Sequence, residues 1–309
     1  MSVAQGPAAD FPLAATRGFA DLAQFGRPGW WRYLVGLASI IFGGLVAILV
    51  LGAIVAAVAP EALTVLDVGV SDWRKVDLGA AAVVFLIFLG SIIVFLPITL
   101  AVVPIVHGRR WLSVITERKS FGWRFFAVSL AATLGIGLAG IGLEFLVATQ
   151  DIEIVFHGRA FLVFLPLVLL LIPLQVSAEE VFFRGYLYQM VGRMTGNHAV
   201  RLLVPATLFA GVHLANPEVE AGGVWAILVY VAIALYLGWL TLRSGGLEMA
   251  IGLHLGNNLV AISLVGSTGS PRLAPTVFFV NNPNFAVEFF ATVVAFTLHW
   301  LIVRRFLRT

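Results

Sequence analysis

The residues best suited to chemistry in this chain stand close together in the stretch QVSAEEVFFRGYL, residues 175–187. Glu179, Glu180 and Arg184 follow an apolar run, AFLVFLPLVLLLIPLQ, in which further leucines would be expected. Ionisable side chains are costly in such surroundings, so they are candidates for a functional site. Glu180 and Arg184 are four residues apart and are expected to pair on one helical face. Glu179 is rotated about 100° away and is left free for chemistry.

Three other polar side chains lie in apolar segments at matching depths. They are His213 in LFAGVHLAN, and His254 and Asn258 in IGLHLGNNLV. Counted from the expected cytoplasmic helix ends, Glu179, His213, His254 and Asn258 lie roughly 16, 18, 10 and 16 Å into the membrane. These side chains are therefore expected to converge at one level. Phe209, four residues before His213, is expected to brace the imidazole.

One carboxylate, two imidazoles and an amide can support hydrolysis of an acyl bond in two ways. A carboxylate in a low-dielectric site can act as general base towards water. An imidazole can orient that water or protonate a leaving amine, and a second imidazole with an amide can hold an oxyanion. Alternatively, Glu179, His213 and His254 supply the three ligands of a catalytic zinc ion. The residues alone leave both routes open.

The elements that must position these residues are membrane-spanning helices. Of the 309 residues, 60% are hydrophobic and 11% are charged, against about 25% charged in a soluble domain. The composition predicts an all-α, polytopic membrane protein with about eight transmembrane helices. The predicted spans are 33–59, 79–106, 125–148, 160–190, 202–215, 222–242, 247–266 and 285–303.

The distribution of Lys and Arg predicts the orientation of the spans. With the N-terminus in the cytoplasm, eight spans place only four of the 19 basic residues on the outer side: Arg74, Lys75, Arg159 and Arg272. The excess on the other side follows the positive-inside rule, so both termini are predicted to be cytoplasmic. The basic pI of about 9.6 is explained by this topology, and no nucleic-acid partner is expected.

The chain divides into an N-terminal cytoplasmic or interfacial segment, residues 1–32, and a single transmembrane domain, residues 33–309. The catalytic core is expected within 160–266. Aromatic residues near the first span are expected at the level of the lipid headgroups: Trp30, Trp31 and Tyr33.

Three short motifs in this core resemble a known family. EEVFFR (179–184) fits E-E-x-x-x-R, FAGVH (209–213) fits F-x-x-x-H, and HLGNN (254–258) fits H-x-x-x-N. In this order, each on a predicted span, they resemble the CAAX-protease and bacteriocin-processing family (CPBP, also called ABI) of intramembrane endopeptidases. That family includes the type II CAAX prenyl endopeptidases.

The resemblance implies a role for each motif residue. Glu179 would activate the water with the assistance of His213, while His254 and Asn258 would form the oxyanion hole. The supporting residues would be Glu180, Arg184 and Phe209. A cofactor is not certain, because the family has been described both as metal-independent glutamate proteases and as metalloproteases, in which case zinc would be held by Glu179, His213 and His254.

The expected partners are the lipid bilayer and a membrane-associated or prenylated peptide or protein substrate, and the expected location is the cell membrane, plasma or inner. The chain contains no H-E-x-x-H and no G-x-S-x-G, which argues against a zincin and against a serine hydrolase. The remaining ionisable residues of the spans, Glu144 and His299, are expected to be non-catalytic, with His299 at the inner interface.

Two alternative functions stay open at this point. A catalytically silent relative could serve as a membrane scaffold or partner protein, although no motif residue is missing. A proton-coupled transporter also places glutamates and histidines at mid-membrane, although the sequence shows no inverted repeat.

Overall fold

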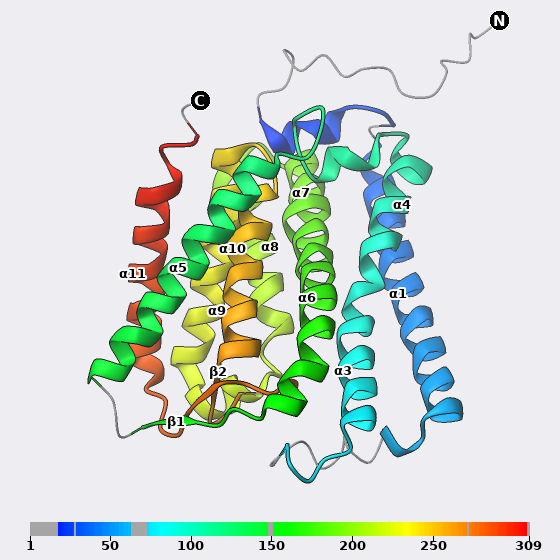
Figure 1. Cartoon of the computed structure of the whole chain (residues 1–309). Helices are drawn as coiled ribbons and strands as arrows, with labels where there is room; N and C mark the ends of the chain where they lie inside the picture. The colour runs from blue at the N-terminus through cyan, green and yellow to red at the C-terminus, as the bar shows by residue number, and fades with distance from the viewer. Residues whose placement is uncertain (1–17, 28, 63–72, 148–150, 271, 308–309) are drawn as a thin grey trace, which may run out of the picture.

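The structure is a computed structural model, and it describes residues 18–27, 29–62, 73–147, 151–270 and 272–307. Residues 1–17 and 28 of the predicted N-terminal segment lie outside this description. The helices form one bundle, and their axes run between two ends of the molecule (Figure 1). The α-helices are α1 (Trp30–Val58), α3 (Leu78–Ile93), α4 (Phe95–His107), α5 (Trp123–Val147), α6 (Gly158–Glu180), α7 (Tyr188–Met194), α8 (His198–Val212), α9 (Pro217–Ser244), α10 (Glu248–Leu259) and α11 (Phe285–Val303).

Shorter helical segments complete the bundle. They are the 3₁₀ helices η2 (Phe19–Gln24) and η3 (Trp111–Val114), and the π-helical η4 (Val181–Leu187) and η5 (Val260–Leu264). Each of the eight predicted spans coincides with helix over most of its length, although 202–215 ends in a turn after Val212 and 247–266 ends in the first residues of a strand. Six of these spans are long and apolar enough to cross a membrane by length and composition, while α8 has 15 residues and α10 has 12.

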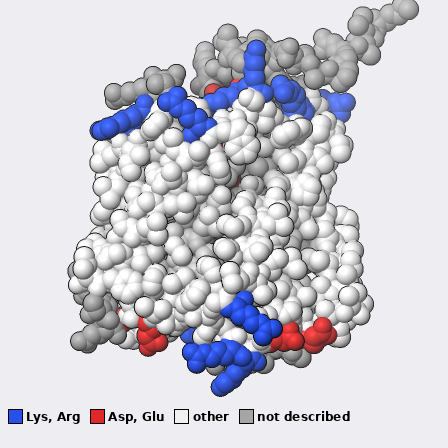
Figure 2. Space-filling model, viewed as in Figure 1, with Lys and Arg blue, Asp and Glu red and all other residues white. Residues whose placement is uncertain are grey.

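The bundle has the charge distribution of a multi-pass membrane protein. On the face shown in Figure 2, basic and acidic side chains gather at the two ends of the molecule, and the broad surface between them is almost entirely uncharged. Large apolar side chains cover the outside of the helices, and Phe42 and Leu49 of α1 are 71% and 73% exposed. Helix η2 and the C-terminal end of α11 lie at the same end of the bundle (Figure 1), as expected for an even number of spans. The protein is an integral, multi-pass membrane protein.

The predicted all-α class is correct except for one small sheet, which the sequence did not indicate. Strands β1 (Ile152–Ile154), β2 (Val265–Ser267) and β3 (Phe278–Val280) join in the order β1-β3-β2. β1 pairs with β3 antiparallel and β2 pairs with β3 parallel. Each strand has only three residues, too few to show an alternating apolar pattern. The sheet ties together loops at the outer end.

Two predicted interfacial positions differ in the structure. Trp30 and Trp31 are well exposed, but Tyr33 is 1% exposed and accepts a hydrogen bond from Arg109 Nη2 at 3.2 Å. His299 is also 1% exposed, because it lies inside the bundle with polar partners on α5 and α9. Sequence neighbours such as Trp300 and Arg304 had suggested the interface, but the ring itself faces inward.

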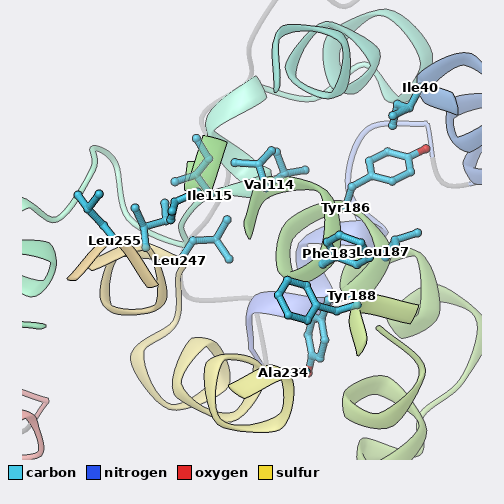
Figure 3. Close-up of a cluster of buried hydrophobic side chains, with 14 of the residues drawn as sticks. Ile40, Val114, Ile115, Phe183, Tyr186, Leu187, Tyr188, Ala234, Leu247 and Leu255 are labelled. Carbon is cyan, nitrogen blue, oxygen red and sulfur yellow. The ribbon is translucent and has the colours of Figure 1, made fainter. Parts of the chain in front are cut away.

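The largest buried apolar cluster surrounds η4. Phe183, Tyr186 and Leu187 of η4 contribute to it, with Val114 of η3 and Leu247 from the turn before α10 (Figure 3). This packing fixes the end of α6, which carries the two glutamates. The core therefore lies directly beside the candidate site.

Candidate active site

Glu180 is the central acceptor of the candidate site. Its side chain is fully buried, and Oε1 accepts hydrogen bonds from Arg184 Nη1 at 2.9 Å and from His254 Nδ1 at 2.8 Å. The Arg184 guanidinium also stacks over the Phe209 ring at 4.0 Å. The predicted pair of Glu180 with Arg184 is confirmed. The contact with His254 was not predicted, and it joins α6 to α10.

Glu179 faces the same side of the bundle with one oxygen held and the other free. Oε1 accepts a hydrogen bond from Gln175 Nε2 at 2.6 Å. Oε2 lies 3.6 Å from His254 Nε2, and it has no hydrogen-bond partner among the residues that the structure describes. The side chain is 11% exposed. Glu179 therefore points into the protein, as the helical spacing predicted.

His254 lies between the two carboxylates. A carboxylate only accepts hydrogen bonds when ionised, so Nδ1 carries the proton that bonds Glu180 and Nε2 faces Glu179. The helix behind the ring is fixed by a close contact, because Gly252 and Gly256 lie against α5. A Cβ atom at Gly256 would come within 2.8 Å of Thr133 Cβ, and one at Gly252 within 3.0 Å of Ser129 Cβ. Small residues four apart allow such close packing of membrane helices.

His213 follows directly after the last residue of α8. Its Nδ1 donates to the backbone carbonyl of Phe209 at 2.7 Å, which leaves Nε2 free to bind another group. The ring is held between Phe209 and Tyr230, with ring centroids 4.4 and 4.7 Å away. The predicted bracing by Phe209 is confirmed. His213 also interacts electrostatically with Glu179 and His254.

Asn258 joins the cluster through a residue that the sequence analysis missed. Asn258 Nδ2 donates to Gln175 Oε1 at 3.2 Å, and Gln175 in turn bonds Glu179. Asn257, the neighbouring amide, is exposed. Gln175 is uncharged and so escaped a search for ionisable groups, although its position four residues before Glu179 could have revealed it. Tyr230, whose ring packs against His213 at a tilt, was missed because nothing in the sequence relates α8 to α9.

Two π-helical segments adjoin the site. η4 begins directly after Glu180, and η5 begins two residues after Asn258. π-helical turns are rare and often occur at functional sites. No sequence rule predicted either π-helical segment.

Glu179, His213 and His254 are the residues that would hold a zinc ion in this site. Glu179 Oε2 and His254 Nε2 are close enough to be two ligands of one ion, since ligands of zinc lie about 2.0–2.2 Å from the metal. Within the described residues, however, no group of three His, Cys, Asp or Glu side chains is close enough to hold a metal ion. The predicted set of Glu179, His213 and His254 does not fit as these side chains lie. No catalytic step is therefore derived through a metal.

The part of the chain that contains this site is similar to known proteins. Residues 159–260 match the family model described as Rce1-like, type II CAAX prenyl endopeptidase. A protein of Bacillus subtilis (strain 168) described as "Uncharacterized protein YyaK" is 31% identical over 187 residues, which are 60% of this chain and 62% of that protein. No solved structure matches the chain. The three motifs all lie in the matched segment, so residues 159–260 are similar to the Rce1-like, type II CAAX prenyl endopeptidase family that the motifs resemble.

Proposed function

We propose that this protein is an intramembrane endopeptidase of the CAAX-protease type, in which Glu179 activates a water molecule. The observation that carries the proposal is the free oxygen of Glu179. Oε2 is a buried acceptor without a partner among the described residues, 3.6 Å from the Nε2 atom of His254. A buried acceptor requires a hydrogen-bond donor, and a water molecule at this oxygen would be placed for general-base catalysis.

In the first step, water attacks the carbonyl carbon of the substrate peptide bond. Glu179 Oε2 takes one proton from the water as the new C–O bond forms, and the carbonyl oxygen becomes an oxyanion. Gln175 occupies Oε1, which leaves Oε2 as the basic oxygen. His213 Nε2, the ring nitrogen not bound to Phe209, is assigned to orient the attacking water.

His254 and Asn258 are assigned to the oxyanion. Because His254 Nδ1–H already bonds Glu180, a donor at Nε2 means that the ring acts as an imidazolium. Glu180 and Glu179 together offset the positive charges of that ring and of Arg184. Oxyanion donors are worth about 10²–10³-fold in rate when they are fixed before the reaction. Glu180 thus contributes to the chemistry through His254, beyond its pairing with Arg184.

In the second step, the tetrahedral intermediate collapses and the C–N bond breaks. The proton that Glu179 accepted passes to the leaving amine, so the products are a carboxylic acid and an amine, and transfer of the acid proton to the amine then gives a carboxylate and an ammonium group. Glu179 is then an ionised base again. Each proton taken up in the first step is returned in the second, and no additional reactant is required.

The proposed substrate is a membrane-associated or lipidated peptide or protein. By helical rise, Glu180 lies roughly 20 Å from the cytoplasmic end of the continuous helix that ends at Met194, so a substrate must reach well below the membrane surface. A prenylated C-terminus is the substrate class that the family description names. Its hydrocarbon group would partition into the bilayer beside the site.

The test is a comparison of peptide termini in membranes that contain the wild-type protein or Glu179→Gln. We expect termini that depend on the wild-type protein and disappear with Glu179→Gln, and cleavage of a synthetic farnesylated CAAX peptide by the purified protein. Glu144→Gln is the matched control, because Glu144 also lies in a spanning helix, α5, and it should keep full activity. Wild-type rates in Glu179→Gln would exclude this carboxylate as the base.

Metal dependence is tested on the same cleavage. With catalysis by Glu179 and water alone, dialysis of the purified protein against a strong chelator should leave turnover unchanged. Loss of turnover, with recovery on addition of Zn²⁺, would contradict the metal-independent route. It would require His213 to move towards Glu179 and His254.

A further inference from the structure

Gln175 forms a bridge between two parts of the candidate site. It is 6% exposed in the apolar part of α6. Its amide donates to Glu179 Oε1 at 2.6 Å and accepts from Asn258 Nδ2 at 3.2 Å. The side chain therefore connects the proposed base on α6 to the proposed oxyanion donor on α10.

The direction of this bridge follows from its partners. An ionised carboxylate can only accept hydrogen bonds, so the nitrogen of the Gln175 amide must face Glu179. The oxygen of the same amide then faces Asn258, whose nitrogen is the donor. One N–H of Asn258 is used in this bond and the second remains for another acceptor. The bridge fixes which carboxylate oxygen is occupied and which way the Asn258 amide is turned.

The side chains that could replace Gln175 each lose part of this function. Glutamate has the same length, but it cannot donate when ionised and would add a third negative charge beside Glu179 and Glu180. Asparagine is one methylene shorter, and methionine fills a similar volume without any strong donor or acceptor. A polar side chain buried in a membrane helix has a free-energy cost that hydrogen bonds must offset. Both of its polar atoms are used here.

We infer that Gln175 is a positioning residue, which turns Glu179 Oε2 towards the water and holds the Asn258 amide towards the oxyanion. This inference rests on the proposed function. Gln175 does not itself touch the reacting atoms. Its effect is therefore expected on kcat, with little effect on substrate binding.

The test compares Gln175→Met with Ser177→Ala, using the cleavage that distinguishes wild-type protein from Glu179→Gln. Ser177 lies on the same helix, and among the described residues its hydroxyl bonds within that helix, to Pro173 O at 2.7 Å. We expect Gln175→Met to lower kcat roughly 10- to 100-fold, since small misplacements of catalytic groups have effects of this size. KM should be nearly unchanged, and Ser177→Ala should behave as wild type.

A double variant separates positioning from a general structural role. If Gln175 acts through Asn258, then Asn258→Ala should cost much less turnover in the Gln175→Met background than in the wild type. If the two substitutions lower kcat independently, so that the loss in the double variant is the product of the single losses, the inference is overturned. A wild-type kcat in Gln175→Met would overturn it as well. Should Gln175→Met fail to fold, Gln175→Asn retains the amide and is expected to show the same loss of kcat.

The result with Glu179→Gln separates a failure of the proposed function from a failure of the positioning role of Gln175. If Glu179→Gln retains cleavage, the proposed function fails. If Glu179→Gln is inactive while Gln175→Met is fully active, the proposed function stands and only the positioning role of Gln175 is wrong.

Discussion

The candidate site and the surroundings of His299 are both buried polar clusters between helices, but their hydrogen bonds are arranged differently. Ser129 Oγ donates to Met249 O at 2.6 Å, so it accepts from His299 Nε2 at 2.9 Å. His299 Nδ1 then accepts from the hydroxyl of Tyr236 at 2.9 Å. Each of these polar atoms has a partner, and the bonds join α5, α9, α10 and α11.

The candidate site is open, in the sense that some of its polar atoms lack hydrogen-bond partners, whereas the His299 cluster is closed because its polar atoms are paired. Oε2 of Glu179 and Oε2 of Glu180 lack partners among the described residues, although each carboxylate is held firmly through its Oε1 atom. Buried polar atoms in proteins are nearly always satisfied, so unsatisfied oxygens on two adjacent glutamates require an explanation. A histidine in a membrane helix therefore indicates a functional site only when neighbouring polar atoms lack hydrogen-bond partners.

The largest effect is expected for Glu180→Gln, which disturbs the open cluster at its centre. Arg184 would remain buried without a carboxylate partner, and breaking a buried ion pair in this way costs about 3–5 kcal/mol. His254 would lose its charged acceptor at the same time. We expect a much lower Tm in detergent and a large loss of turnover in the molecules that remain folded.

The control for Glu180→Gln is Glu248→Gln. Glu248 is also fully buried, but its partner Arg118 is 30% exposed and can turn to solvent. A smaller fall in Tm is expected, without loss of turnover per folded molecule. Equal effects of the two substitutions on turnover would mean that Glu180 has no special relation to His254.

The second prediction compares the two histidines directly. His254→Gln should reduce turnover about 10²–10³-fold, as expected for loss of an oxyanion donor, with a modest change in Tm. His299→Gln should lower Tm and leave turnover per folded molecule unchanged. Tm and turnover are measured on both variants. If His299→Gln loses turnover and His254→Gln does not, or if the two variants behave alike, the candidate site and the His299 cluster do not differ as described.

The smallest effect is expected for Ser129→Ala in the closed cluster. The hydroxyl links His299 to the backbone of α10, and single hydrogen bonds between membrane helices are worth about 0.6 kcal/mol, with a maximum near 1.7. A small decrease in Tm and unchanged turnover are expected. A loss of turnover larger than that of His299→Gln would show that the hydroxyl affects α10 by another route.

The sequence was sufficient for the approximate positions of the spans and for the faces of Glu179 and Glu180, but not for the inward direction of His299. Helical rise placed Glu179, His213, His254 and Asn258 at one depth, and four-residue spacing predicted the pair of Glu180 with Arg184. Spacing along one helix does not determine how that helix is rotated towards another. The contact of His254 with Glu180 depends on such a rotation and was therefore not predictable.

Other features depended on properties that hydropathy does not record. Gln175 carries no charge, so the rule that singles out ionisable residues passed over it. The π-helical segments η4 and η5 differ from α-helix by a wider turn, and their composition is as apolar as that of their neighbours. Helix α8 was expected over 202–215 but ends at Val212, which leaves His213 at the point where the chain turns.

The close contact of Gly252 and Gly256 with α5, a seam between two helices, affects how variants of this protein should be interpreted. His254 projects from the side of α10 opposite to this seam, so its reach towards Glu180 is set by how deeply the two backbones can approach. A methyl group added at Gly256 would push the whole helix forward or tilt it, and every catalytic side chain would still be present. Such a substitution would lower turnover as a change in the candidate site would, although Gly256 contacts α5 and not Glu179 or Glu180.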